Sequence, residues 1–167
     1  MPNLVELVQQ PVLDEYVHLY QVDTTILGGL IYYFTPMVKD GSLDPVAFDG
    51  HDYTPVDFES EGWEANGQGQ LPTPKIRIAN TTSYLVALLQ QYDDLLGATV
   101  KRIRTFKRYL DGESEANPGM IFPIDVYRID RKSTENKLFI EFELAAPIEQ
   151  ANRKLPGRQV LRDVCTL

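Results

Sequence analysis

The sequence has a single cysteine, two histidines and no long hydrophobic run. One cysteine excludes an internal disulfide bond, and no window approaches the ~20 consecutive apolar residues that a membrane-spanning helix needs. Basic residues are fewer than acidic ones: the chain has 16 Lys and Arg and 24 Asp and Glu, which gives a formal net charge of -8. We therefore expect no direct membrane span and, since an acidic chain repels phosphate groups at long range, no specific nucleic-acid binding.

The motifs of common catalytic and nucleotide-binding sites are also missing. The chain has no Gly-x-Ser-x-Gly, no His-Glu-x-x-His and no glycine loop that ends in Gly-Lys-Ser or Gly-Lys-Thr. His18 and His51 lack a Cys, Asp or Glu partner at the spacings that recur in metal sites. The pair Asp93-Asp94 lies near the end of a predicted helix, which favours a solvated surface. These absences predict that the chain is not an enzyme and has no catalytic residues.

The apolar residues that are present mostly follow a period of two, as β-strands do. They make up 43% of the 167 residues, enough for the core of one domain. We expect extended segments at residues 15–22, 30–34, 56–64, 98–110, 120–130 and 138–144, and a hairpin over 46–53 with its turn at Asp49-Gly50. About eight strands predict a mainly β fold, an antiparallel barrel or sandwich.

One α-helix is expected within this β fold, at about Thr82–Leu96. Apolar side chains there recur at i, i+3, i+4 and i+7, Thr82 can cap the first turn and Gly97 can end the last. Such a stripe usually packs on a sheet. For the domain organisation, the sequence predicts a short helical segment at 1–14, a β domain at 15–150 and a linker at 151–167.

Glycine and proline cluster just before a strand-like run at residues 75–79. The expected structural loop contains Gly62, Gly67, Gly69 and Pro74. Because a strand and not a helix follows, the Gly-x-Gly pair does not suit a phosphate-binding loop. We expect Gly67 or Gly69 to hold a positive φ or to lie against the backbone of another subunit.

A second notable segment is basic. Five of its eight residues carry positive charge, and they are Lys101, Arg102, Arg104, Lys107 and Arg108. Interleaved aromatic residues, Phe106 and Tyr109, would suit single-stranded nucleic acid, but the rest of the chain is acidic. The segment is therefore predicted to contact an acidic surface of a neighbouring subunit, with a solvated strand surface as the alternative.

Taken in order, these features resemble the minor tail protein L family of lambda-type siphophages from about residue 15 to 167. The most specific block runs from Gly62 through Asn66-Gly67 and Gly69 to Pro74 and the strand Ile76-x-Ile78-Ala79-Asn80. Further matching pieces are Phe48-x-Gly50-x-x-Tyr53-x-Pro55, Leu96-Gly97-Ala98-Thr99-Val100, Phe106-x-x-Tyr109-Leu110-Asp111, Pro147, Pro156-Gly157-Arg158 and Cys165-Thr166.

The resemblance implies a structural hub protein of the phage tail tip. It implies a homo-oligomer, a trimer, between the ring of distal tail protein and the central tail fibre protein, close to the tape measure protein and lining the DNA exit path. The expected location is the tail tip of the virion, after assembly in the host cytoplasm. Two alternatives stay open: the hexameric distal tail protein of the same assembly, and a small tail-associated β-barrel hydrolase.

The resemblance also bears on Cys165. In the family, cysteines of a C-terminal part hold a 4Fe-4S iron–sulfur cluster, and Cys165 matches the first of them. One cysteine cannot hold such a cluster, which needs about four ligands. We therefore expect no cofactor within these residues, and a cluster with Cys165 as its first metal ligand in a longer native chain.

Overall fold

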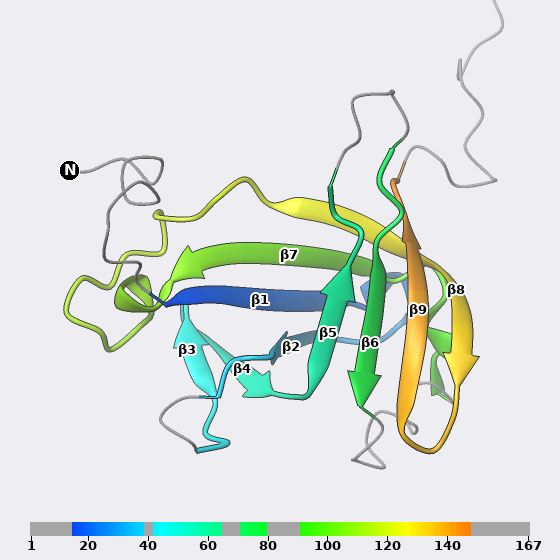
Figure 1. Cartoon of the computed structure of the whole chain (residues 1–167), viewed down its shortest axis with the longest axis horizontal. Helices are drawn as coiled ribbons and strands as arrows, with labels where there is room; N and C mark the ends of the chain where they lie inside the picture. The colour runs from blue at the N-terminus through cyan, green and yellow to red at the C-terminus, as the bar shows by residue number, and fades with distance from the viewer. Residues whose placement is uncertain (1–14, 39–41, 65–70, 80–90, 148–167) are drawn as a thin grey trace, which may run out of the picture.

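The computed structural model describes residues 15–38, 42–64, 71–79 and 91–147. Nine strands form one sheet in the order β3-β4-β2-β1-β7-β8-β9-β6-β5 (Figure 1). Their bounds are β1 Tyr16–Asp23, β2 Ile31–Thr35, β3 Val46–Phe48, β4 His51–Pro55, β5 Phe58–Glu61, β6 Lys75–Ala79, β7 Thr99–Phe106, β8 Asp125–Glu135 and β9 Phe139–Ala145. The mainly β prediction is confirmed.

The predicted antiparallel barrel or sandwich is not confirmed, because the sheet is mixed and not closed. Within the described residues β2 and β4 form the one parallel pair, with Phe34 opposite Thr54. The hairpin predicted over 46–53 is present as β3 and β4. Its turn holds Asp49 at φ 54° and Gly50 at φ 70°, the left-handed conformation that a two-residue hairpin loop requires.

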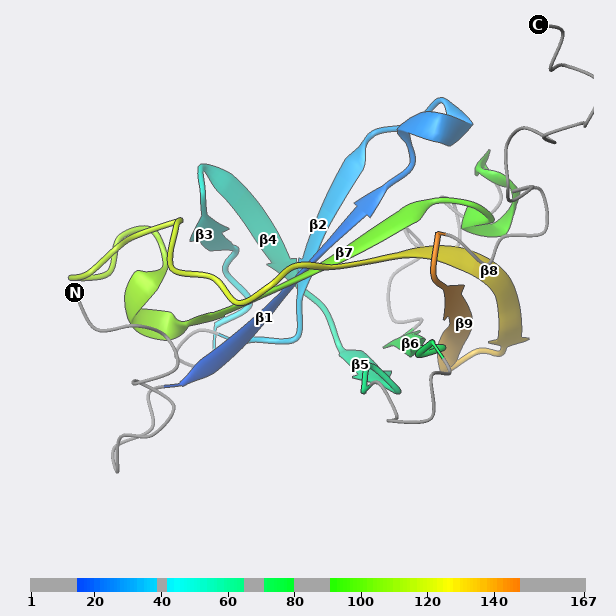
Figure 2. The same ribbon diagram turned by 90° about the horizontal axis from the view of Figure 1, so that it is seen from above.

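The central strands β1 and β7 are buried on both faces. On one face, Tyr20 and Val22 belong to a large core built with β5, β6, β8 and β9. On the other face, Val17 and Leu19 belong to a smaller core with β3 and β4. The two ends of the sheet therefore fold over opposite faces of its middle (Figure 2). Barrel closure would require the edge strands β3 and β5 to pair, and this arrangement keeps them on opposite sides.

The end of the sheet that contains β5 is rolled, and two features explain the roll. The pairing of β8 with β9 has register shifts between Ile129 and Arg131 and between Lys132 and Thr134. Such bulges bend a strand and increase its twist. In addition, the Tyr20 ring of β1 stacks on Phe58 of β5 at 4.1 Å, and its hydroxyl hydrogen-bonds Ser60 Oγ at 2.6 Å. Side chains thus join β5 to β1 where no strand ladder links them within the described residues.

The predicted helix at Thr82–Leu96 is not confirmed. Residues 80–90 lie outside the described residues, and a short 3-10 helix, η2, occupies Asp93–Leu95. It contains a kink, since Asp94 and Leu95 hold φ values of 56° and 59°. The expected packing holds for two members of the stripe, because Tyr92 and Leu95 contact the large core. The predicted segments at 1–14 and 151–167 also lie outside the described residues.

The strand boundaries differ most from the prediction at three places. β7 ends at Phe106, and the 3-10 helix η3, Lys107–Tyr109, follows, which lets the consecutive residues Tyr109 and Leu110 both be buried. β8 begins only at Asp125, because Pro123 donates no ladder hydrogen bond. β8 also continues to Glu135, past the end predicted at residue 130. The remaining 3-10 helix, η1, spans Thr25–Leu27 between β1 and β2.

No helix in the described part of the chain is long and apolar enough to cross a membrane.

Candidate functional site

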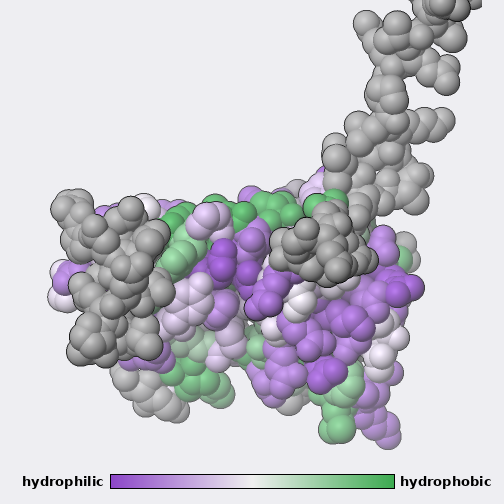
Figure 3. Space-filling view, turned by 45° about the horizontal axis from the view of Figure 1, so that its top comes forward, coloured by the Kyte–Doolittle hydropathy of each residue, from purple (hydrophilic) through white to green (hydrophobic). Residues whose placement is uncertain are grey.

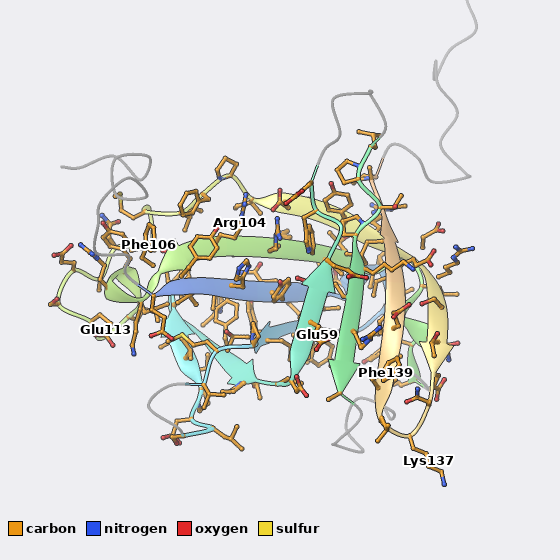
Figure 4. The ribbon with its side chains drawn as sticks, in the orientation of Figure 1. Glu59, Arg104, Phe106, Glu113, Lys137 and Phe139 are labelled. Carbon is orange, nitrogen blue, oxygen red and sulfur yellow. The ribbon has the colours of Figure 1, made fainter. Side chains whose placement is uncertain are left out.

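The candidate site lies on the face of β1 and β7 that the rolled end leaves partly uncovered. In the ladder between these strands His18 is opposite Arg104 and Tyr20 is opposite Arg102. Because side chains two residues apart share a face of a strand, these four groups lie together. Arg104 and Phe106 are labelled along β7 in Figure 4, with Glu59 on β5 in front of the central strands.

The segment after β5 covers part of this face. The indole of Trp63 lies over the Arg102 guanidinium, 3.9 Å from its carbon to the ring centroid, and meets Tyr127 edge-on at 5.4 Å. Gly62 makes the necessary bend with φ 77°, and a Cβ there would lie 3.3 Å from the Thr73 carbonyl oxygen and 3.5 Å from Pro74 Cα. The structure therefore brings together Gly62 and Pro74 of the predicted loop, whereas Gly67 and Gly69 lie outside the described residues.

Between the face of β1 and β7 and the segment after β5 is a groove of about 740 Å³, which we call the Trp63 groove. It is lined by Tyr16, His18, Ser60, Glu61, Gly62, Trp63, Glu64, Arg102 and Arg104. Glu61 and Glu64 are exposed, while Arg102 is only 8% exposed. The arginines therefore form the floor of the groove and the glutamates lie at its outer rim.

Asp125 at the start of β8 sets the charge of this floor. Its Oδ2 accepts hydrogen bonds from Arg102 Nε at 2.9 Å and Nη2 at 2.7 Å. The same oxygen is 3.5 Å from Arg104 Nη2, which also donates to the Pro123 carbonyl at 3.2 Å. Burial, followed by the charges of Arg102 and Arg104, lowers the pKa of His18 from 6.5 to about 4. At neutral pH the floor thus carries two positive charges against one negative charge.

Three buried polar atoms of the groove residues have no hydrogen-bond partner. They are His18 Nδ1, Trp63 Nε1 and Arg104 Nε, and within the described residues no other buried side-chain nitrogen or oxygen lacks one. An unsatisfied buried polar group costs about 1–3 kcal/mol, so each calls for an explanation. All three belong to residues that line the Trp63 groove, and each atom is covered by the chain itself.

The basic segment does not form one surface. Arg102 and Arg104 face the Trp63 groove, whereas Lys101, opposite Gln21 in the ladder, belongs to the other face of β7. Lys107 and Arg108 lie in η3, where they pair with Glu15 at 3.2 Å and Glu115 at 4.0 Å. Strand alternation and the end of β7 at Phe106 separate these charges. Whether any of them contacts a neighbouring subunit stays a prediction.

Sequence reasoning missed His18 and Trp63 as members of a site. The only available signal for His18 was the alternation Tyr16-x-His18-x-Tyr20, which puts three rings on one face of a strand. In the structure Tyr16 meets His18 edge-on at 4.9 Å and Tyr20 is stacked 6.4 Å beyond it. His51, by contrast, is exposed on β4 and stacks on Tyr33 at 4.5 Å.

The outer surface of the rolled end is a separate charged region, mostly hydrophilic in Figure 3. Arg77 on β6 pairs with Glu141 at 2.9 Å and Glu59 at 3.3 Å. Lys132 on β8 pairs with Asp94 at 2.7 Å. Ion pairs of alternating sign on neighbouring strands suit a solvated face. Within the described residues no three potential metal ligands lie close enough together to hold an ion.

Comparison with known proteins gives this geometry a context. The profile of the family described as Phage minor tail protein L matches residues 25–167. The chain belongs to this family. The match includes every strand of the sheet except β1, and it includes Trp63, Arg102 and Arg104 of the groove. The resemblance inferred from the sequence is therefore confirmed, and the protein is a bacteriophage tail component.

Among individual proteins, the chain is similar to Tail tip protein L of Escherichia phage lambda. The two are 30% identical over 154 residues, which is 89% of this chain and 66% of the lambda protein. This chain thus spans about two thirds of the length of the relative that it matches. Functions that belong to the whole lambda protein do not transfer without further support.

Proposed function

We propose that this chain is a structural component of the tail tip, a hub subunit between the ring of distal tail protein and the central tail fibre protein. The observation that carries the proposal is the family match over residues 25–167, together with the name of the lambda relative. The relative is called a tail tip protein, and 89% of this chain aligns with it. The described sheet lies almost entirely inside the matched region.

The form of the sheet supports a structural function. Two cores lie on opposite faces of the β1–β7 pair, so the middle of the molecule is rigid and both ends are anchored to it. The edge strands β3 and β5 are short, as is common for edges that must avoid uncontrolled pairing. A subunit of a symmetric assembly needs such a rigid body with defined surfaces.

The proposal includes a homo-oligomer, a trimer, that surrounds the DNA exit path near the tape measure protein. The net charge of -8 supports this position, because negative walls reduce contact with passing phosphates. The virion tail tip is then the site of action, after assembly in the host cytoplasm.

Electron microscopy of intact tails tests the proposal. We expect density that fits the rolled nine-stranded sheet at the tail tip, with three-fold symmetry, between the distal ring and the fibre. Six-fold symmetry at the ring would replace the hub assignment with that of a distal tail protein. Density elsewhere along the tail would reject both.

A hydrolase assay tests the remaining alternative. We expect the purified chain to leave peptidoglycan, peptide and phosphodiester substrates intact. Turnover that disappears in His18→Gln or His51→Gln would overturn this expectation and support the enzyme alternative. Folding of both variants is verified by circular dichroism, so that lost turnover is not confused with unfolding.

A further inference from the structure

We propose that the Asp49–Gly50 turn is a site of spontaneous isoaspartate formation, and that the carboxylate of Asp111 suppresses this reaction. Asp49 and Gly50 form the exposed two-residue turn between β3 and β4. An aspartate followed by glycine is especially prone to this change, because glycine has no side chain to obstruct attack by its backbone nitrogen. The inference goes beyond the proposed function and does not depend on it.

The reaction needs only the chain and water. The Gly50 nitrogen gives up its proton and bonds to Asp49 Cγ, while the hydroxyl of the Asp49 carboxylic acid leaves with a proton as water, so that a succinimide ring closes. Water then opens the ring. When it breaks the bond between the Asp49 main-chain carbonyl carbon and the Gly50 nitrogen, the chain continues through Asp49 Cγ and the product is isoaspartate. Nothing is oxidised or reduced, and the water that is lost is regained.

Asp111 binds the hydrogen that this reaction must remove. Gly50 N–H donates a hydrogen bond to Asp111 Oδ2 at 2.9 Å. Asp111 N–H in turn donates to the Ala47 carbonyl at 3.0 Å, so the residue is attached to the hairpin at two points. The preceding Leu110 is buried in the same core as Phe48. The position of the carboxylate is therefore set by the fold and not by the local sequence of the turn.

This hydrogen bond opposes the reaction for two reasons. A hydrogen bond to the protonated form of a group stabilises that form, so the Gly50 proton becomes harder to remove. The negative charge of the carboxylate also disfavours an anion on a nitrogen that is 2.9 Å away. Asp111 therefore protects the turn in the folded chain, although Asp49 and Gly50 are both exposed to water.

Loss of this protection would damage the hairpin. Phe48 is opposite His51 in the ladder, so the register of β3 and β4 depends on a turn of two residues. Isoaspartate adds a carbon to the main chain of that turn. The change would displace Phe48 and Tyr53, which are both buried in the smaller core. Because a virion component is not resynthesised after assembly, such damage would accumulate in the tail.

Asp111–Gly112 is a second Asp–Gly pair within the described residues, and it supplies an internal comparison. Gly112 is exposed, and its N–H has no hydrogen-bond partner in the described part of the chain. Exchange of a backbone amide hydrogen at neutral pH also begins with removal of the proton by base. We expect the Gly50 amide of the wild type to exchange more slowly than that of Gly112 by about tenfold or more, as a hydrogen bond to a charged group implies. Equal exchange would overturn the inference.

Ageing of the full chain tests the modification itself. The protein is incubated in neutral buffer below its unfolding temperature, and isoaspartate is counted by enzymatic methylation and located by peptide mapping. Asp111→Ala removes the acceptor, and we expect isoaspartate at Asp49 to form about tenfold faster than in the wild type. Glu115→Ala is the matched control, because it removes an exposed carboxylate of the same loop whose partner is Arg108. It should leave the rate at Asp49 unchanged.

Hydrogen exchange of the variant separates a direct effect from a general loosening. In Asp111→Ala we expect the Gly50 amide to lose its protection while the amides of β3 and β4 keep theirs. Joint loss in all of them would mean that the hairpin has opened, and it would overturn the inference. Equal ageing at Asp49 in Asp111→Ala and the wild type would do the same, and slower ageing in the variant would make Asp111 a base that promotes the reaction. If Asp111→Ala does not fold, the comparison of Gly50 with Gly112 in the wild type decides.

Discussion

Arg102 is held from three directions at the centre of the molecule. Asp125 accepts two of its hydrogen bonds, Trp63 covers its planar face and Tyr20 is its neighbour across the ladder. A guanidinium suits this position, because it can form a forked ion pair and stack on an aromatic ring at the same time. A buried charge of this kind costs free energy unless all these partners are present. The residue therefore connects β7 to β8 and to the segment after β5.

The first prediction concerns His18 and the pH dependence of stability. The pKa of His18 is about 4 in the folded chain, against 6.5 for the free side chain, because the ring is buried beside Arg102 and Arg104. Between these two values the unfolded chain binds more protons than the folded one, so acid favours unfolding. The stabilisation is complete above about pH 6.5 and is lost as the pH falls toward 4.

We expect this loss to be on the order of 1–3 kcal/mol after allowance for solvent screening. Urea unfolding from about pH 7 down to pH 4.5 measures it. His18→Gln should flatten the dependence, since the amide does not titrate, and His51→Gln on the exposed β4 should leave it in place. Equal slopes in the wild type and His18→Gln would contradict the prediction.

The second prediction concerns Gly62. We expect Gly62→Ala to lower the free energy of unfolding by about 1–3 kcal/mol, because φ is 77° and the new Cβ would lie 3.3 Å from the Thr73 carbonyl oxygen. Gly112→Ala separates the two causes, since its φ is 86° but a Cβ there meets nothing within 4 Å. Chemical denaturation of both variants gives the comparison. If the control loses as much stability, the close approach to Thr73 and Pro74 is unimportant.

At the scale of elements, the roll of the sheet depends on how β5 is attached to β1. β5 has a strand ladder only to β6 within the described residues, so its free side needs another attachment. The stacked rings of Tyr20 and Phe58 and the hydrogen bond to Ser60 supply it. The bulges of β8 add bend and twist to the same end of the sheet.

The third prediction tests this attachment with a double-mutant cycle. Tyr20→Phe and Ser60→Ala each remove one partner of the 2.6 Å hydrogen bond and little volume. We expect each to cost about 1 kcal/mol of unfolding free energy, and the double variant to cost about as much as either one alone. Urea unfolding of the four proteins gives the coupling. Additive losses would show that the hydroxyl groups do not interact and that ring packing alone holds β5.

At the scale of the whole molecule, the surface carries both paired charges and exposed apolar side chains. The outer surface of the rolled end consists largely of paired charges. The most exposed apolar residues lie in turns and connections: Leu138 between β8 and β9 is 76% exposed, Leu43 before β3 is 75% exposed, and Leu30 and Ile26 between β1 and β2 are 69% and 63% exposed. A subunit that contacts several different neighbours needs surfaces of unlike character.

The fourth prediction concerns Cys165, which lies outside the described residues. In a native chain that continues past Leu167, we expect three further cysteines and a brown protein with a 4Fe-4S cluster. Cys165→Ser should remove the iron and the visible absorbance while the sheet keeps its far-ultraviolet circular dichroism, because the two described cores end at residue 144. Iron analysis of protein made from the intact gene measures this. A longer chain without iron would refute the expectation.

The sequence by itself determined the features that depend on near neighbours. The Asp49-Gly50 turn was predictable, because only certain residues adopt its backbone angles at low cost. The alternation of Leu138, Ile140, Phe142 and Leu144 likewise predicted a strand with one buried face. The last three are buried in β9, whereas Leu138 precedes the strand and is exposed. The family was also recognisable, since its short motifs keep their order along the chain.

The tertiary structure alone decided what distant residues do together. Leu19 and Tyr20 are consecutive and both buried, so the period of two of a half-buried strand does not predict them. Both are buried because two separate parts of the chain cover the two faces of β1. The basic segment looked continuous in sequence, yet alternation and the end of β7 divide it between two faces and a turn. The Trp63 groove requires β1, β5 and β7 at once. No local sequence pattern predicts that residues of these three strands lie together, because their proximity depends on how the whole sheet bends.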